Sequence, residues 1–138
     1  MQSLQNLVSK LYLEDSNVSH VQPNVQVSCQ ELAAKPDKGQ VVIFDADGHV
    51  AGYAILIFFW SNEYGGDIIE IDELYVDEVY RRSGVATKFF EWLADAFGEK
   101  CAGLSLQVSE QNQTALSFYQ KLGFEHSRNQ HLIKVHTK

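Results

Sequence analysis

The spacing of apolar residues over the first third of the chain predicts two helices. Leucine, valine and tyrosine recur at helical intervals from Leu4 to Tyr12, as in an amphipathic helix. The polar stretch over residues 16–26 predicts a loop. Ser28 followed by Glu31 forms a capping-box pattern, which predicts a short helix over residues 28–34 that ends before Pro36.

The pattern then becomes that of strands. The β-branched run over residues 41–44 is followed by a turn sequence, Asp45-Ala46-Asp47-Gly48, and by a long apolar run over residues 50–60. That run is well short of the roughly 20 residues that span a bilayer, so it predicts a buried strand. A polar segment with paired glycines precedes a third strand, expected over residues 68–76. Adjacent strands joined by short turns predict an antiparallel meander.

Beyond residue 84 the pattern alternates between helix and strand, which predicts a βαβ unit with a parallel strand pair. Gly98 is placed to end the first of these helices, while Asn112 as N-cap and Gly123 at C′ delimit the second. The elements are expected over residues 85–97, 104–108, 112–122 and 131–136. The fold class is therefore mixed α/β: a mostly antiparallel sheet with one parallel pair and flanking helices.

Composition limits the possible partners. The chain has 138 residues and is 45% hydrophobic, which fits one domain over residues 1–138. Its formal net charge of −7 argues against nucleic acid, because phosphate binding requires a basic face. The acidity suits either a cationic substrate or simple solubility. The first ten residues lack a signal-peptide pattern, so we expect a cytoplasmic protein that does not bind membranes.

The cysteines and histidines show no metal-site spacing. Cys29 and Cys101 are far apart, and neither belongs to a CxxC or His/Cys cluster, so no metal is expected. Two free thiols are the default in a reducing compartment, although a single disulfide is the alternative.

Residues 74–87 predict an anion site, because a strand runs into a turn that opens a helix. Unpaired N–H groups at a helix N-terminus attract phosphate. Gly84 and Ala86 are small enough for close approach, Arg81 and Arg82 carry positive charge, and Thr87 carries a hydroxyl. The GxGxxG and P-loop signatures are both absent. The alternative is a solvated loop with a plain glycine turn.

The segment Arg81-x-x-Gly84-x-Ala86 resembles the (Gln/Arg)-x-x-Gly-x-(Gly/Ala) signature of the GNAT N-acetyltransferase superfamily. The resemblance covers residues 41–124. It includes Leu-Tyr-Val ahead of the signature, and Asn112, Ala115, Phe118-Tyr119 and Leu122-Gly123-Phe124 after it. The family usually starts with a strand before its first helix, and that first edge strand is missing here.

The resemblance implies binding of acetyl-CoA and direct attack by an amine in a ternary complex. It implies that Tyr119 protonates the departing thiolate, a task that suits a phenol that is neutral at pH 7. A core aromatic is the alternative for Tyr119, and capping alone would explain Asn112. The implied cofactor-binding residues are Leu74, Tyr75 and Val76 along pantetheine, then Arg81, Arg82, Ser83, Gly84, Val85, Ala86 and Thr87 at the pyrophosphate, with Asn112 and Tyr119.

Three carboxylates on the third strand are candidates for the base that deprotonates the amine. Strict alternation places Glu70 and Asp72 on one face and Glu73 on the other. A β-bulge, usual in the family, would change which side chain faces the cleft. We rank Asp72 first, Glu73 second and Glu70 third. The alternative is an exposed polar strand face.

The acceptor is expected to be a small cationic amine. Aromatic residues over positions 58–64, with Glu63 and Asp67, provide charge and cation–π contacts. The region resembles the polyamine and diamine acetyltransferase branch. Amino-acid-like amines, aminoglycosides and protein amines remain alternatives, as does a non-catalytic acetyl-CoA-binding module on the same fold. A homodimer is common in this superfamily and is left open.

Overall fold

The computed structural model describes residues 2–14 and 23–136 and divides them into two units, one up to Gln107 and one from Val108. The first unit contains α1 (Gln2–Glu14), α2 (Val25–Ala34), β1 (Gly39–Ala46), β2 (His49–Ser61), β3 (Gly66–Val76), the 3₁₀ turn η1 (Glu78–Tyr80), α3 (Val85–Phe97) and β4 (Gly103–Leu106). The second contains α4 (Gln113–Lys121). Among the described residues no strand precedes α1.

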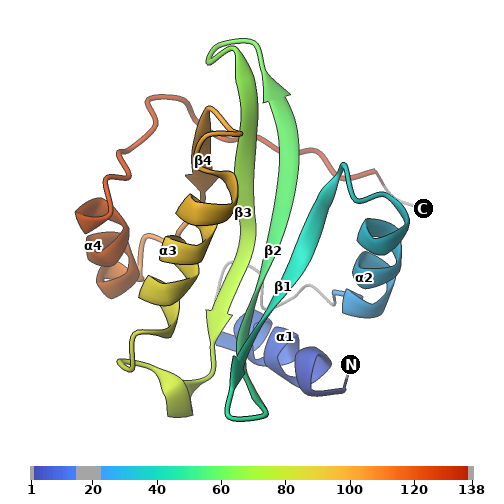
Figure 1. Ribbon diagram of the computed structural model, residues 1–138. Coiled ribbons are helices and arrows are strands. Elements are labelled where there is room, and N and C mark those ends of the chain that lie inside the picture. The colour runs from blue at the N-terminus through green and yellow to red at the C-terminus, as the bar shows by residue number, and fades with distance from the viewer. Residues whose placement is uncertain (1, 15–22, 137–138) are drawn as a thin grey trace. The chain divides into compact units, whose positions relative to one another are not determined.

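The four strands form one mixed sheet in the order β1-β2-β3-β4, which confirms the predicted fold class (Figure 1). β1 and β3 pair antiparallel with β2, whereas β4 pairs parallel with β3. The parallel pairing ends at Ile71 and Leu106, although β3 continues to Val76. The second half of β3, from Asp72 to Val76, is therefore not paired with β4.

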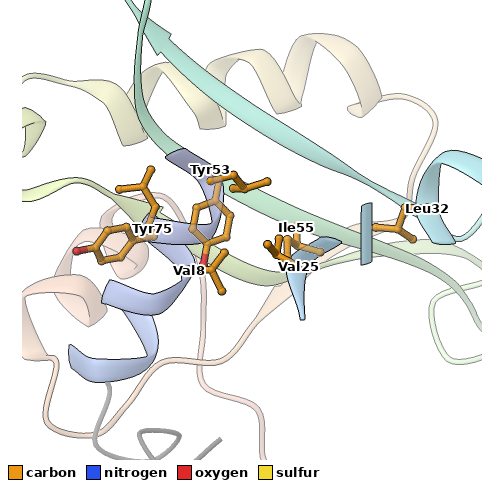
Figure 2. Close-up of a cluster of buried hydrophobic side chains, with 8 residues drawn as sticks. Val8, Val25, Leu32, Tyr53, Ile55 and Tyr75 are labelled. Atoms are coloured by element: carbon orange, nitrogen blue, oxygen red, sulfur yellow. The ribbon is translucent and has the colours of Figure 1, made fainter. Parts of the chain in front are cut away.

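Helices cover both faces of this sheet. The apolar stripes of α1 and α2 pack on one face, where Tyr53, Ile55 and Tyr75 complete a buried cluster (Figure 2). α3 packs on the other face, with its Phe89 ring 5.2 Å from that of Phe44 and its Phe97 ring 5.6 Å from that of Phe58. Each face of the sheet thus has its own apolar layer, and α1 and α2 lie over the face that carries Tyr75.

The start of α2 differs from the prediction. The helix begins at Val25 with Asn24 as its N-cap, whose Oδ1 accepts a hydrogen bond from the Val27 N–H at 3.1 Å. Ser28 lies inside the helix and donates its hydroxyl to the Asn24 carbonyl oxygen. The predicted capping box was wrong because Asn24 is an equally good cap placed one turn earlier. Of the predicted loop, residues 16–22 lie outside the described residues.

The final predicted strand is also wrong. Residues 131–136 form no strand, and Leu132, Ile133 and Val135 are exposed. An alternating apolar pattern is not sufficient, because a strand is stable only when it pairs with another. Within the second unit α4 agrees with the prediction: Asn112 Oδ1 accepts from the Ala115 N–H at 3.1 Å, and Gly123 has φ +103° at C′.

Candidate active site

A β-bulge at Asp72 reorganises the carboxylates of β3. Ile55 on β2 is opposite Glu73, but the next residue, Leu56, is opposite Ile71, so Asp72 has no cross-strand partner. Residues opposite each other in an antiparallel pair share a face. Glu73 therefore lies on the face of Ile55, the same face as Glu70, which is opposite Ile57. The alternation expected from the sequence, with Glu73 on the other face, is wrong because the bulge adds one residue.

The bulge brings two carboxylates to one cavity. The cavity is open to solvent, has a volume of about 410 Å³ and lies between α2 and the sheet. Asp72 and Glu73 both line it, whereas Glu70 does not. Its other lining residues are Val27, Ser28, Glu31, Leu32, Lys38, Ile55, Ile57 and Phe58. Apolar walls with a few polar groups are typical of a small-molecule site.

Glu73 is held by two tyrosines. The Tyr12 hydroxyl of α1 donates to Oε2 at 2.6 Å, and the Tyr53 hydroxyl of β2 donates to Oε1 at 2.7 Å. Burial raises the pKa of the Glu73 carboxyl, the two hydroxyl donors oppose this, and the neighbouring Asp72 charge adds to the increase. The contacts of Tyr12 and Tyr53 with Glu73 were not predictable from sequence, because the three residues come from distant segments.

Asp72 has a different environment. The residue is exposed, yet partial burial of its carboxyl at the cavity wall raises the pKa of that group. No side chain in the described parts of the chain donates a hydrogen bond to this carboxyl. A carboxylate with a raised pKa and open lone pairs is suited to accept a proton.

Ion pairs partly neutralise the rim of the cavity. Glu31 accepts from Lys38 at 2.6 Å and from Lys35 at 3.2 Å, and both lysines lower the pKa of the Glu31 carboxyl. The charges of Asp72 and Glu73 have no such basic partner among the described residues, so the inner wall of the cavity is the more negative part.

The predicted anion site is a turn followed by a helix start. Arg82 has φ +65° and Gly84 has φ +84°, and no side chain caps α3 at Gly84. The first N–H groups of α3, from Val85 to Thr87, have no partner within the helix. A Cβ at Gly84 would meet no atom within 4 Å, so the space beside these N–H groups is open. This donor set fits a pyrophosphate.

The Arg81 side chain is turned to the protein itself. Its Nε donates to the Val76 carbonyl oxygen at 2.9 Å, and its Nη2 donates to the Glu14 carboxylate at 3.1 Å. The guanidinium also lies 5.1 Å from the centre of the Tyr75 ring, which is buried in the cluster beneath α1. Of the predicted cofactor residues, Arg81 and Tyr75 thus have side chains engaged in intramolecular contacts.

Tyr119 belongs to the second unit. Its ring lies 5.7 Å from that of Phe118 and 5.9 Å from that of Phe124, and burial raises its pKa. The phenol is therefore protonated at neutral pH, the form that a proton donor requires. Asn112 caps the same helix.

Comparisons with known proteins identify the family. The sequence model of the acetyltransferase (GNAT) family matches residues 2–124. This chain belongs to the acetyltransferase (GNAT) family. Thialysine N-epsilon-acetyltransferase from Bos taurus is 32% identical over 75 residues, which cover 54% of this chain and 44% of that protein. The chain therefore spans less than half the length of the curated relatives that it matches.

Solved structures share the GNAT fold. A possible acetyltransferase from Clostridium difficile 630 superposes with a TM-score of 0.78 at 21% identity, covering 99% of this chain and 91% of that chain. An aminoglycoside acetyltransferase from an uncultured soil metagenomic sample, in complex with sisomicin, has a TM-score of 0.77 at 14% identity, covering 99% and 88%. At these identities the likeness concerns the fold alone.

The β2–β3 hairpin contributes little to the cavity that Asp72 and Glu73 line, although its aromatic and acidic residues were expected to hold the acceptor. Trp60 and Tyr64 are 68% and 65% exposed, and neither lines the cavity; nor do Glu63 and Asp67. Phe58 alone of the aromatic run lines it.

Three further observations concern the described residues. They contain no group of three or more His, Cys, Asp or Glu that could hold a metal ion. None of their helices is long and apolar enough to cross a membrane. Cys29 and Cys101 are free thiols.

Proposed function

We propose that this GNAT protein is an N-acetyltransferase that moves an acetyl group from acetyl-CoA to a primary amine of a small cationic molecule. The whole chain, residues 1–138, is proposed to act as one catalytic domain in the cytoplasm. The observation that carries the proposal is the bulge at Asp72, because it places two carboxylates at the wall of one cavity beside the strand that leads to the anion loop.

The acceptor half of the reaction rests on Asp72 and Glu73. A protonated amine is attracted by the two negative charges, and its apolar part fits against Leu32, Ile55 and Ile57. The amine attacks only after losing a proton, and Asp72 accepts it, because its pKa is raised and its carboxyl accepts no hydrogen bond from the described residues. Glu73, fixed by its two tyrosines, holds the positive charge in place.

The donor half rests on the anion loop and on the second half of β3. Backbone N–H groups of residues 82–87 bind the pyrophosphate, and the backbone of residues 74–76, beyond the last β4 pair, offers hydrogen bonds to pantetheine. Acetyl-CoA supplies the activated acetyl thioester. The family resemblance assigns the contact with the pantetheine arm to Asn112, and to Tyr119 the donation of the proton that the departing thiolate takes up.

The relatives support an amine as acceptor. The thialysine N-epsilon-acetyltransferases of Bos taurus and Mus musculus, by their names, act on thialysine, and one solved structure of the same fold was determined with sisomicin, an aminoglycoside. Both compounds carry primary amines. The charge of the cavity favours a cationic acceptor over a neutral one.

The test measures CoA release from acetyl-CoA with a panel of acceptors: a diamine, spermidine, thialysine, lysine, sisomicin and a peptide with a free N-terminus. Acetylated products are identified by mass spectrometry. Release with a small cationic amine supports the proposal. Release with the peptide alone would replace it with protein acetylation, and binding of acetyl-CoA without release to any acceptor would indicate a non-catalytic module.

A further inference from the structure

The last turns of α1 contact the segment that leads into the anion loop. Glu14, the last residue of α1, accepts hydrogen bonds from the Arg81 guanidinium at 3.1 and 3.3 Å and from the Tyr75 hydroxyl. One helical turn earlier, Lys10 forms an ion pair with Asp77 at 3.4 Å. Two contacts of opposite polarity thus connect one helix end to residues 75–81.

The position of Glu14 is unfavourable for the helix alone. A negative charge at a helix C-terminus is repelled by the helix dipole, and α1 has no basic residue in its last turn to offset it. The partner that compensates this charge is Arg81, which lies 67 positions away in sequence. The helix itself therefore does not explain an acidic residue at this position, whereas the tertiary contact with Arg81 does.

Arg81 in turn closes the turn that precedes the anion loop. Its Nε donates to the Val76 carbonyl oxygen, so the side chain bridges the two ends of the segment from Val76 to Arg81. The following residue, Arg82, has φ +65°, a conformation that costs free energy in a non-glycine residue and persists only where its surroundings fix it. Arg81 precedes Arg82 directly, and its side chain is held by contacts with Tyr75 and Glu14, so it restrains the backbone at Arg82.

We propose that Glu14 is a positioning residue for the acetyl-CoA site: through Arg81 it holds the turn whose backbone N–H groups receive the pyrophosphate. The inference rests on the proposed function. It assigns the Arg81 guanidinium to an exposed ion pair with Glu14 rather than to the phosphates, and leaves the backbone N–H groups as the donors to the phosphates.

The experiment uses the full chain and compares wild type with Glu14→Gln, Arg81→Gln and the double variant. Acetyl-CoA binding is measured by calorimetry, and the KM values for acetyl-CoA and for the acceptor are measured separately. Glu14→Gln is expected to weaken the binding of acetyl-CoA about three- to tenfold, because a part-exposed ion pair and its hydrogen bonds are lost. The KM for the acceptor is expected to change less than twofold. The double variant is expected to weaken binding no more than Arg81→Gln alone.

Glu91→Gln serves as the control for charge. Glu91 lies on the exposed side of α3, and its replacement removes the same charge without touching the Glu14–Arg81 contact. It is expected to leave acetyl-CoA binding within twofold of wild type. Glu14→Asp, which keeps the charge on a shorter side chain, is expected to retain more binding than Glu14→Gln and provides a second variant if the latter folds poorly.

The outcomes separate the inference from the proposed function. Unchanged acetyl-CoA binding in Glu14→Gln, equal losses of affinity for both substrates, or strictly additive effects in the double variant would each overturn the positioning role. Absence of acetyl-CoA binding in the wild type would overturn the proposed function itself, and the inference with it.

Discussion

Asp72 and Glu73 are adjacent in sequence but have different hydrogen-bond environments. Each carboxylate oxygen of Glu73 accepts a hydrogen bond from one tyrosine hydroxyl, whereas the Asp72 carboxylate accepts no hydrogen bond from the described residues. Burial raises the pKa of both carboxyls, and only for Glu73 do hydrogen bonds oppose it. Adjacent groups with such different surroundings often divide acid–base work between them, and the first two predictions depend on this difference.

Asp72→Asn is expected to reduce turnover about 100-fold or more, the usual contribution of a general base. It is also expected to stabilise the fold at neutral pH. A carboxyl whose pKa is raised on folding stabilises the protein below its unfolded pKa, and this contribution is lost as the pH rises through the folded pKa. Urea unfolding across pH 3–8 should therefore show wild type losing stability relative to Asp72→Asn as the pH rises. Parallel curves would contradict the environment inferred for Asp72.

Tyr12→Phe is expected to raise the pKa of the Glu73 carboxyl, because it removes one of the two hydrogen bonds that favour the charged form. The pH at which kcat/KM for the acceptor reaches half its maximum on the acid side should move upward. Tyr64→Phe, which removes an exposed hydroxyl from the β2–β3 hairpin, provides the matched control. An identical pH profile in Tyr12→Phe would show that Glu73 does not influence catalysis.

Tyr119→Phe is expected to leave acetyl-CoA binding nearly intact and to lower kcat about 100-fold, the range of a single proton donor. The raised pKa of this phenol keeps it protonated across the neutral range. Isothermal calorimetry and initial rates measure the two effects separately. Turnover equal to that of wild type would assign the proton donor to another group.

At the level of elements, the sequence predicted those whose signal is local. The helical period predicted α1 and α3, and Asn112 with Gly123 predicted α4 and its ends, because a cap depends on the residues beside it. The prediction failed where two local signals competed, as Asn24 and Ser28 did at the start of α2. It failed again at residues 131–136, because the pairing of a strand depends on a partner that the segment itself does not encode.

The candidate site shows the same limit. Its residue types were predictable, since Asp72, Glu73 and the turn around Gly84 lie within one short segment, residues 72–84. The bulge position was not, because one added residue reverses the face of every later side chain while leaving the apolar pattern almost unchanged. Contacts to Glu73 and Arg81 from α1 depend on how that helix packs, which periodicity alone does not determine.

Gly84 offers a prediction with a close internal control. Gly84 and Gly48 both have φ +84°, and a Cβ at either would meet no atom within 4 Å. Alanine at either position is therefore expected to cost about 1 kcal/mol of stability through backbone strain alone. Only Gly84→Ala is expected to weaken the binding of acetyl-CoA, since Gly48 lies in the β1–β2 turn. Similar dissociation constants for the two variants would refute the anion-site assignment.

At the level of the whole molecule, the net charge should affect the two proposed substrates, which carry charges of opposite sign, in opposite ways. The chain carries a formal net charge of −7, and the cavity wall includes Asp72 and Glu73 without a basic partner among the described residues. The proposed donor, acetyl-CoA, is an anion, so we expect it to bind through local donors at the start of α3 against an unfavourable net field. A cationic acceptor, in contrast, is attracted both by the net charge and by the cavity.

This asymmetry predicts opposite responses to salt. Increasing ionic strength from low to about 0.5 M shortens the screening length to a few ångströms, so the KM of a diamine should rise several-fold. A monoamine of the same chain length should show a shallower rise, because it carries one charge rather than two, and this pair of acceptors cancels any general effect of salt on the fold. The KM of acetyl-CoA should fall or stay level, since salt screens its repulsion from the acidic chain. Steady-state rates at five salt concentrations measure all three slopes. Equal slopes for the two amines would mean that the cavity recognises shape rather than charge, and the cationic acceptor would have to be given up.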